Sequence, residues 1–381
     1  MSLNIDGVDR IYDPRIENIN PWERPKVISC GNLYSTVLRN NHSLLSWGWD
    51  SRDQVSNTAS GSNFIQISCG DTMVTALRMD GSLSSWGKYQ SGSFFYDWGE
   101  RNPSGNNFVQ VSCGSSNATA LRNDGTLLSW GSYHDGTSWK NWAGTNPEGN
   151  DFIQVACGFR YATALKQNGT LISWGLDDSN QVTNTPSGNN FVQVSCGHGH
   201  GTALTEDGTL LSWGRDDHNQ VTNTPTGNDF VQVSCGYNYC CALKKDGSLV
   251  TWGIDNYNQV SNTPSGNDFI QVACGNVHSV ALRKDGTLVS WGRDALNSLS
   301  QTPQTNNFWI FITDDIDVLI KFSINNEIKI LSILNEPNTI DEFKIYNKGN
   351  VYYAELVPFN DPKASNIKIK FPSGILAWAL K

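Results

Sequence analysis

The stretch VSCGHGHGTALTEDGTLLSWG occupies residues 194–214, and close variants of it recur through most of the chain. Each copy has a Cys-Gly pair followed, 17 residues after the Cys, by a Trp-Gly pair. The seven cysteines are Cys30, Cys69, Cys113, Cys157, Cys196, Cys235 and Cys274, and the seven tryptophans are Trp47, Trp86, Trp130, Trp174, Trp213, Trp252 and Trp291. Self-similarity at a period of about 40 residues is typical of a repeat architecture. This repeat therefore decides the fold.

The spacing of the copies is regular, with two exceptions. Successive copies are 39 residues apart, but the second-to-third and third-to-fourth steps are 44. The additional residues all lie between a Trp-Gly pair and the next Cys-Gly pair. In repeat proteins, insertions of this kind usually form loops on one face.

Within one copy, the segment NDFVQVSCG at residues 228–236 is typical of a short strand. Simple alternation predicts two faces, one with Val231, Val233 and Cys235 and the other with Phe230, Gln232 and Ser234. The polar stretch that follows Trp-Gly contains a brief apolar segment around Val221, which is a candidate fourth strand. Each copy should thus form an antiparallel sheet of three or four strands.

Two β-rich runs in each copy are joined by an Asp-Gly or Asn-Gly pair. This is a strong hairpin signal, and the type I′ turn that it favours needs a positive φ at both central residues. The first copy has Asn41 and His42 at this place. Its turn should be more strained or of another type, because His seldom adopts a positive φ.

Seven sheets of about 40 residues bury both faces by packing radially into a closed ring. The sequence therefore predicts an all-β fold, a seven-bladed β-propeller followed by a small C-terminal all-β module. An open β-solenoid is the competing architecture, although its repeats are usually shorter and it needs caps.

The segment VSCGHGHGTALTEDGTLLSWGRDDHNQV at residues 194–221 resembles the repeat of the regulator of chromosome condensation family. The resemblance covers about residues 26–305 and implies a seven-bladed propeller. Members include a nucleotide-exchange factor for the GTPase Ran, ubiquitin-ligase domains, a plant ultraviolet-B photoreceptor and a bacterial β-lactamase inhibitor. The resemblance therefore implies a fold without selecting a function. The photoreceptor's Gly-Trp-Arg-His-Thr signature does not occur in this chain.

A change of composition after residue 305 indicates a domain boundary, since only two glycines follow it and Cys and Arg disappear. We predict an N-terminal segment at 1–25, the propeller at 26–305 and the C-terminal module at 306–381. In the module, residues 318–334, 343–357 and 367–380 each have the pattern of a hairpin.

Charge and cysteine usage restrict the partners and the compartment. A net charge of −9 and a pI of 5.1 oppose direct binding to nucleic acid. The N-terminal stretch lacks the pattern of a signal peptide, and no apolar run is long enough to span a membrane. Cysteines repeated by architecture are expected to be buried free thiols. We therefore expect an intracellular, cytoplasmic protein without membrane association.

No pattern in the sequence predicts a catalytic residue, a metal ligand or a cofactor. The fourth place after the Cys is His only at His200 and His278, and elsewhere it is Tyr34, Met73, Asn117, Tyr161 and Tyr239. A place that accepts Met and Asn does not suit a general base or a metal ligand. His198 and His200 in the GHGH stretch are interpreted as polar residues near a strand start, because no zinc motif lies nearby.

Two further features have structural interpretations. The adjacent Cys240 and Cys241 are interpreted as structural thiols, since vicinal disulfides are strained and no basic residue lies closer to them in sequence than Lys244 and Lys245. A carboxylate three places after the Trp recurs and is expected to fix a turn through backbone N–H groups. These carboxylates are Asp50, Asp177, Asp216, Asp255 and Asp294.

The two longer repeats carry the candidate site, because repeat proteins usually bind through the parts that break the repeat. Their sequences, residues 88–105 and 132–149, are rich in aromatic residues, which are enriched among binding hot spots. The predicted partner-binding residues are Phe94, Phe95, Tyr96, Trp98, Tyr133, Trp139 and Trp142. The alternative is that these rings cover their own blades or meet the C-terminal module.

The favoured function is a non-enzymatic protein-interaction scaffold that binds a protein partner through these loops. A first alternative is a guanine-nucleotide exchange factor for a small GTPase. A second is a carbohydrate-binding propeller or a structural component of a larger particle. The sequence does not decide the partner or the oligomeric state.

Overall fold

The computed structural model of the chain describes residues 2–5, 8–11, 26–91, 94–134, 137–304, 342–347, 351–357 and 367–372. Side chains are described from residue 26 to residue 304, except at 89–96, 133–136 and 139. The chain divides into two compact units, Asn18–Ile310 and a second unit formed by Met1–Glu17 with Phe311–Lys381.

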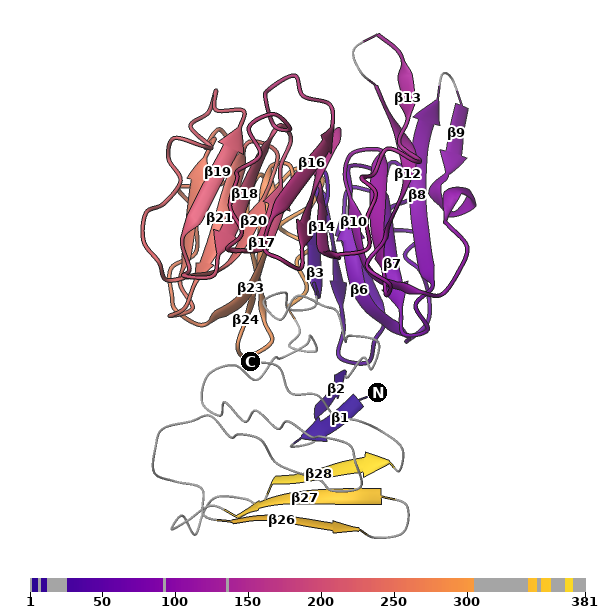
Figure 1. Cartoon of the computed structure of the whole chain (residues 1–381), viewed down its shortest axis with the longest axis vertical. Coiled ribbons are helices and arrows are strands. Elements are labelled where there is room, and N and C mark those ends of the chain that lie inside the picture. Colours follow the sequence, from indigo (N-terminus) through magenta and orange to yellow (C-terminus); the bar gives the residue numbers. More distant parts are fainter. Residues whose placement is uncertain are drawn as a thin grey trace. The chain divides into compact units, whose positions relative to one another are not determined.

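Each of the seven repeats forms one antiparallel sheet, which we call a blade and number in chain order (Figure 1). Blades 1 to 3 are β3 (Ile28–Cys30), β4 (Tyr34–Leu38) and β5 (Leu44–Gly48); β6 (Phe64–Cys69), β7 (Met73–Arg78), β8 (Leu83–Ser91) and β9 (Phe94–Asp97); and β10 (Phe108–Cys113), β11 (Asn117–Arg122), β12 (Leu127–His134) and β13 (Trp139–Asn141). Blades 4 to 7 are β14 (Phe152–Cys157), β15 (Tyr161–Lys166) and β16 (Leu171–Gly175); β17 (Phe191–Cys196), β18 (His200–Thr205) and β19 (Leu210–Gly214); β20 (Phe230–Cys235), β21 (Tyr239–Lys244) and β22 (Leu249–Gly253); and β23 (Phe269–Cys274), β24 (His278–Arg283) and β25 (Leu288–Gly292). The predicted seven-bladed, all-β propeller is confirmed.

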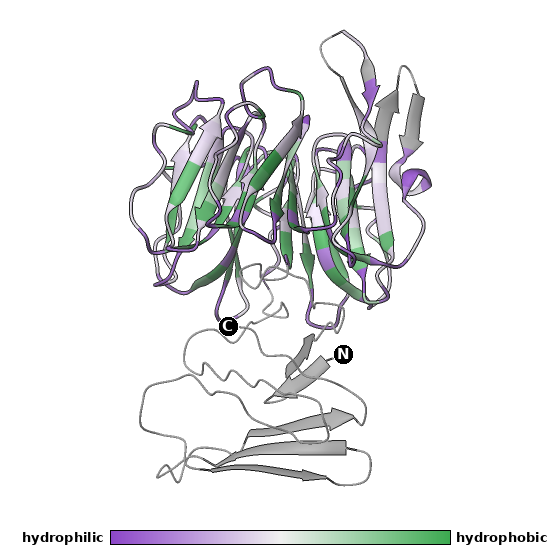
Figure 2. Ribbon diagram, in the orientation of Figure 1, coloured by the Kyte–Doolittle hydropathy of each residue, from purple (hydrophilic) through white to green (hydrophobic). Residues whose placement is uncertain are grey.

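Hydrogen bonds from backbone N–H groups to Gln side chains join the inner strand of one blade to that of the next. The Gln193 Oε1 atom accepts from Val233 N at 2.8 Å, and Gln232 Oε1 accepts from Val272 N at 3.0 Å. The same kind of bond closes the ring, because Gln271 Oε1 accepts from Val27 N at 3.0 Å. Blade 7 thus packs on blade 1 as the other blades pack on one another, with apolar residues along the strands and polar ones in the loops (Figure 2).

The two faces of the inner strand differ from the predicted ones. In blade 6 the register between β20 and β21 shifts between Phe230 and Gln232, and the bulge recurs in blades 2, 3, 4, 5 and 7. Phe230 therefore packs in one cluster with Val233 and Cys235, whereas Val231 packs against the neighbouring cluster. A bulge places one additional residue on its strand, so simple alternation fails at this point.

The hairpin turns lie where Asp-Gly predicted them, but they are not of type I′. In the turn of blade 5 only Gly208 has a positive φ, of +84°, and its N–H donates to Thr205 O at 3.0 Å. This glycine also docks the next blade, because Phe230 N donates to Gly208 O at 3.1 Å. In the first repeat His42 has a φ of +63°, which confirms the unusual turn predicted there.

All nine cysteines are buried and free, which confirms that prediction. The region around Val221 is a turn, so the regular blades have three strands. No helix in the described ranges is long and apolar enough to cross a membrane.

The second unit contains two described sheets. The hairpin β1 (Ser2–Ile5) with β2 (Val8–Ile11) was not predicted. The predicted hairpin at 343–357 is confirmed as β26 (Glu342–Asn347) paired with β27 (Val351–Val357), and β28 (Ile367–Pro372) pairs with β27. The hairpin predicted at 318–334 and the second half of that at 367–380 lie outside the described residues.

We predict that Gly208→Ala lowers the free energy of unfolding by more than Gly144→Ala does. Both residues have a positive φ, which costs an L-residue about 1–2 kcal/mol. A Cβ atom at Gly208 would in addition lie 2.4 Å from Asn228 O, whereas one at Gly144 meets no atom within 4 Å. Urea unfolding of the two variants measures the difference, and equal losses would contradict a docking role for this turn.

Candidate functional site

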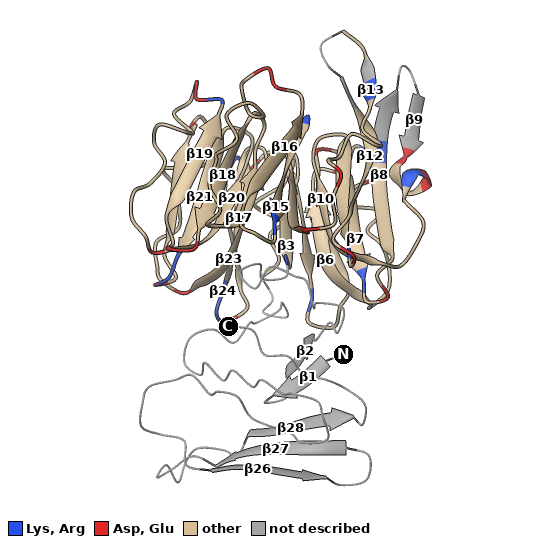
Figure 3. Cartoon of the chain, viewed as in Figure 1, with Lys and Arg blue, Asp and Glu red and all other residues tan. Residues whose placement is uncertain are grey.

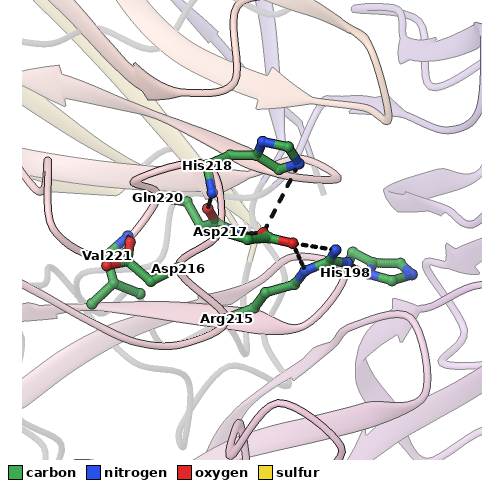
Figure 4. Close-up of polar contacts among 7 residues, drawn as sticks. All are labelled: His198, Arg215, Asp216, Asp217, His218, Gln220 and Val221. Atoms are coloured by element: carbon green, nitrogen blue, oxygen red, sulfur yellow. Dashed lines mark hydrogen bonds and ion pairs between the residues drawn. The ribbon is translucent and has the colours of Figure 1, made fainter.

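The polar segment after Trp-Gly, which we call the tail, packs against the next blade. In blade 5 the Asp216 carboxylate accepts hydrogen bonds from the N–H groups of Val221 and Thr222, at 2.8 and 2.9 Å (Figure 4). Gln220 is fully buried, and its backbone oxygen accepts from Trp252 Nε1 at 3.0 Å. Equivalent carboxylate bonds at Asp50, Asp177, Asp255 and Asp294 confirm that the repeated Asp fixes a turn.

The same indole bond recurs at four other junctions between blades. The donors and acceptors are Trp47 and Ser298, Trp86 and Gln54, Trp213 and Gln181, and Trp291 and Gln259. Each acceptor residue is buried. The tail of one blade thus satisfies the buried tryptophan of the next, including across the point where the ring closes.

The two longer repeats depart from this pattern by extending their third strand. In blade 2, β8 continues to Ser91 and pairs with β9; in blade 3, β12 continues to His134 and pairs with β13. We call these two features the insertion hairpins. They lie on neighbouring blades, as predicted, and both project from the upper edge of the ring in Figure 1.

Trp98 and Trp142 do not belong to an exposed patch, because both side chains are fully buried. Each lies 15 residues before the next repeat's Cys, the same position as Gln220 in its tail. The Trp142 ring stacks on Trp174 with centroids 6.3 Å apart, and its Nε1 donates to Thr119 Oγ1 at 3.2 Å. These two tryptophans therefore take the place of the tail Gln and anchor their hairpins on the blades.

The remaining five predicted residues are placed in the insertion hairpins, but their side chains lie outside the described residues. They are Phe94, Phe95, Tyr96, Tyr133 and Trp139. Their contact with a partner stays a prediction. The two anchors can be told apart in the sequence by their distance from the next repeat's Cys, because each lies 15 residues before it and the other five aromatic residues do not.

We predict that Trp142→Ala lowers the free energy of unfolding by about 3–5 kcal/mol, as truncation of a buried aromatic residue does elsewhere. The change removes the stacking on Trp174 and the bond to Thr119. Chemical unfolding followed by tryptophan fluorescence measures the loss. A variant as stable as the parent chain would contradict the anchoring role.

The mouth of the central channel lies on the same face as the insertion hairpins. The first and third strands of each antiparallel blade run in the same direction, so their carboxyl ends meet at one edge. Arg215, which follows the third strand of blade 5, donates its N–H to Gly199 O, just after the first strand, at 2.8 Å. The seven Cys-Gly pairs line a cavity of about 90 Å³ at the ring's centre.

Three aromatic side chains from consecutive blades line this mouth. His198 lies between Phe159 and Tyr237, with ring centroids 4.3 Å and 4.0 Å away. They occupy the place directly after Cys-Gly in blades 4, 5 and 6. In blades 2 and 7 that place holds Asp71 and Asn276, and Asn276 Nδ2 donates to Asp71 Oδ1 at 3.0 Å. We call the three rings the channel-mouth cluster.

Cationic groups flank the channel-mouth cluster. The Arg160 guanidinium lies 4.6 Å from the Phe159 ring centroid. Arg215 Nη1 lies 3.3 Å from His198 Nδ1, and its Nε donates to Asp217 at 2.7 Å (Figure 4). Burial, with smaller contributions from Arg215 and Arg160, lowers the pKa of His198 to about 4. His198 is therefore neutral at neutral pH. On the described propeller, charged residues lie mainly in the loops and at the strand ends (Figure 3).

The sequence interpretation of His198 as a polar residue near a strand start missed this cluster. The available signal was the place after Cys-Gly, which is aromatic or His in three consecutive repeats and small or polar in the others. Aromatic and Arg side chains are enriched among the residues that contribute most to binding. The channel-mouth cluster is therefore a candidate binding site.

The remaining His and Cys candidates are buried between blades. His278 Nε2 lies 2.8 Å from Ser35 Oγ, and His200 Nε2 lies 3.1 Å from Cys240 Sγ. Cys240 and Cys241 face different junctions, since Cys240 packs with blade 5 residues and Cys241 with blade 7 residues. Strand alternation thus separates the adjacent thiols, in keeping with a structural role.

We predict that stability falls between pH 6.5 and pH 4, in part because of His278. Burial lowers its pKa to about 4, whereas an unfolded His titrates near 6.5. The unfolded chain therefore binds a proton first as the pH falls, which weakens folding by up to about 1.4 kcal/mol per pH unit. Urea unfolding at pH 7, 6 and 5 should show a shallower dependence for His278→Asn. The partly exposed His218→Asn is the control, and identical slopes for His278→Asn and the parent chain would refute the assignment.

Comparison with known proteins supports the fold. The model of the regulator of chromosome condensation repeat matches residues 108–136, 152–181, 191–220, 230–259 and 269–298. The CRINKLY ectodomain of the Arabidopsis thaliana receptor kinase ACR4 is similar at 19% identity and a TM-score of 0.53, over 70% of this chain and 97% of that chain. Prp20p from Saccharomyces cerevisiae, described by its binding to Gsp1p and histones, is similar at 18% identity and a TM-score of 0.54, over 67% and 81%. Human WBSCR16 is similar at 19% identity and a TM-score of 0.53, over 68% of this chain and 87% of that chain. No curated protein sequence matches the chain.

Proposed function

Because five of its seven blades match the model of the regulator of chromosome condensation repeat, we propose that the chain is a non-enzymatic scaffold that binds a protein partner. The partner engages the face that carries the insertion hairpins and the channel-mouth cluster. The similar propeller Prp20p is described by its binding to Gsp1p and histones, which supports a protein partner here. The fold does not select the partner, so the proposal rests on the site.

The observation that carries the proposal is that two independent departures from the repeat share one face. The insertion hairpins lengthen β8 and β12 beyond the edge at which the first strands end. At that same edge the repeat positions after Cys-Gly become Phe159, His198 and Tyr237. Strongly exposed large apolar side chains are few on the described propeller: Leu211, Tyr257 and Leu296. Changes concentrated on one face support binding there.

The buried anchors also support the proposal. Trp98 and Trp142 hold the insertion hairpins against the blades, which limits the conformational freedom that a partner has to remove. A hairpin that is fixed before binding suits a rigid recognition surface. The aromatic residues at 94–96, 133 and 139 then supply the contact area.

We predict that replacing Phe94, Phe95 and Tyr96 together with Ser weakens partner binding at least about tenfold, since one aromatic hot spot contributes about 2 kcal/mol. The partner is first recovered with the whole chain from native extract, and its affinity is then measured by calorimetry. Leu211→Ser is the matched control, because Leu211 is 41% exposed and lies in β19, in a blade without an insertion hairpin. Loss of binding in the control alone would contradict the proposed face.

Tyr237→Ala tests the second half of the same face. This side chain stacks beside His198 at the channel mouth, so its removal should weaken binding without changing the insertion hairpins. An affinity equal to that of the parent chain would confine the site to the hairpins.

Guanine-nucleotide exchange on a small GTPase is the second candidate, favoured by the similarity to Prp20p, which binds Gsp1p. The discriminating measurement is the release of labelled GDP from a panel of small GTPases. Accelerated release that is lost in the Phe94, Phe95 and Tyr96 variant would make the scaffold an exchange factor. Binding without accelerated release would leave the scaffold function alone.

A further inference from the structure

At three of the junctions between blades, the side chains at three positions of the repeat contact one another. They are the residue four places after one Cys, the Cys of the next repeat, and the residue five places after that second Cys. At the junction of blades 7 and 1 they are His278, Cys30 and Ser35. We call such a set a junction triad. The repeat thus builds the same local geometry several times with different side chains.

The side chains of a junction triad are joined by hydrogen bonds. In the triad of blades 7 and 1, Ser35 Oγ lies 2.8 Å from His278 Nε2 and donates to Cys30 Sγ at 3.4 Å. In the triad of blades 6 and 7, Ser279 Oγ lies 2.9 Å from the Tyr239 hydroxyl and 3.5 Å from Cys274 Sγ. A Ser hydroxyl occupies the centre of both triads.

The triad of blades 5 and 6 is different, because it combines an imidazole with two thiols. It consists of His200, Cys235 and Cys240. Cys240 Sγ lies 3.1 Å from His200 Nε2 and 2.7 Å from Cys235 Sγ. All three ligand atoms lie within 4.8 Å of one another, and all three residues are buried. In the other six repeats, the residue five places after the Cys is Ser35, Val74, Ala118, Ala162, Gly201 or Ser279.

The backbone holds the two thiols together. Cys235 is the last residue of β20 and lies directly opposite Cys240 in β21. Directly opposite residues on one face of an antiparallel pair have Cβ atoms about 4.5–5.5 Å apart. His200 reaches the pair from β18 of the preceding blade, so the triad connects two blades.

We propose that His200, Cys235 and Cys240 form a binding site for one thiophilic metal ion of the Cu(I) and Zn(II) class. Thiolate sulfur and imidazole nitrogen are the donors that these ions prefer. Metal–sulfur bonds of about 2.3 Å require the two sulfurs to rotate apart to about 3.7–4.0 Å. The Thr202 hydroxyl, 3.5 Å from Cys240 Sγ, already bonds Ser212. With three protein ligands, the site suits Cu(I) better than Zn(II), which usually takes four ligands in structural sites.

A bound ion would act on the proposed binding face. His198 lies two residues before His200, and Tyr237 lies between Cys235 and Cys240 in the sequence. The ion would therefore tie together the two loops that carry adjacent rings of the channel-mouth cluster. This inference does not depend on the identity of a protein partner.

The repeat provides matched variants for the test. Cys240→Ser gives the triad of blades 5 and 6 the same residue types as the natural triad of His278, Cys30 and Ser35, so the fold should tolerate it. Ser35→Cys performs the reverse change and gives the triad of blades 7 and 1 two thiols and an imidazole. One variant should remove the site, and the other should create a second one.

The experiment measures the number of metal ions bound per full-length chain by elemental mass spectrometry. Because the site is buried, the chain is refolded under reductant with Cu(I) or with Zn(II) and then desalted. We expect about one equivalent in the parent chain, less than a tenth of that in Cys240→Ser and about two equivalents in Ser35→Cys. The parent chain should also melt at a higher temperature with metal than without it, whereas Cys240→Ser should melt at the same temperature in both.

Several outcomes would overturn the proposal. These are a parent chain that retains neither ion, undiminished retention in Cys240→Ser, or unchanged stoichiometry in Ser35→Cys that melts like the parent chain. A disulfide between Cys235 and Cys240 in the reduced preparation would also overturn it. A metal-free Cys240→Ser that melts like the metal-free parent chain shows that lost metal, and not a damaged fold, explains its result.

Discussion

The closed ring depends on side chains of one blade satisfying backbone groups of the next. On the inner strands, Gln side chains accept from backbone N–H groups of the neighbouring blade. Further out, Trp indoles donate to carbonyls of the preceding tail. Buried backbone groups have to find partners, so each of these bonds fixes where the neighbouring blade sits. Since blade 7 makes the same bonds to blade 1, the ring closes without an exchanged strand.

The sequence predicted the architecture because the architecture is repeated. Seven copies in register required seven sheets, and the Asp-Gly pairs and recurrent Asp residues marked the correct turns. Details that depend on local geometry escaped. The bulge after Phe230 exchanged the expected faces of Phe230 and Val231, and only one residue of each hairpin turn has a positive φ, Gly in six repeats and His42 in the first. Neither property follows from strand alternation.

The site was harder to predict because it depends on neighbours from other repeats. In the sequence, Trp98 and Trp142 look like part of the inserted residues, but they occupy the buried position that Gln220 has in its own tail. His198 has no aromatic neighbour in the sequence, but the ring brings Phe159 and Tyr237 to it. The seven copies of the place four residues after the Cys are not equivalent, because their neighbours differ. His200 has neighbours that its counterparts lack, since Cys240 replaces the Ser that faces His278.

The replacement of Gln by Trp explains how the propeller accepts a new face without losing its ring. A hairpin inserted after β8 or β12 displaces the tail whose carbonyl would satisfy the next indole, and Trp130 and Trp174 have no acceptor for Nε1 among the described residues. At the junction of blades 3 and 4, stacking of Trp142 on Trp174 fills that space with aromatic contact. A buried donor left without a partner costs about 1–3 kcal/mol, and an aromatic pair contributes about 0.5–1.5 kcal/mol beyond its buried area, so the stacking offsets part of the cost. The five added residues therefore extend the third strand outward while the chain returns to its tail position. The ring is kept, and only the surface at one edge is changed.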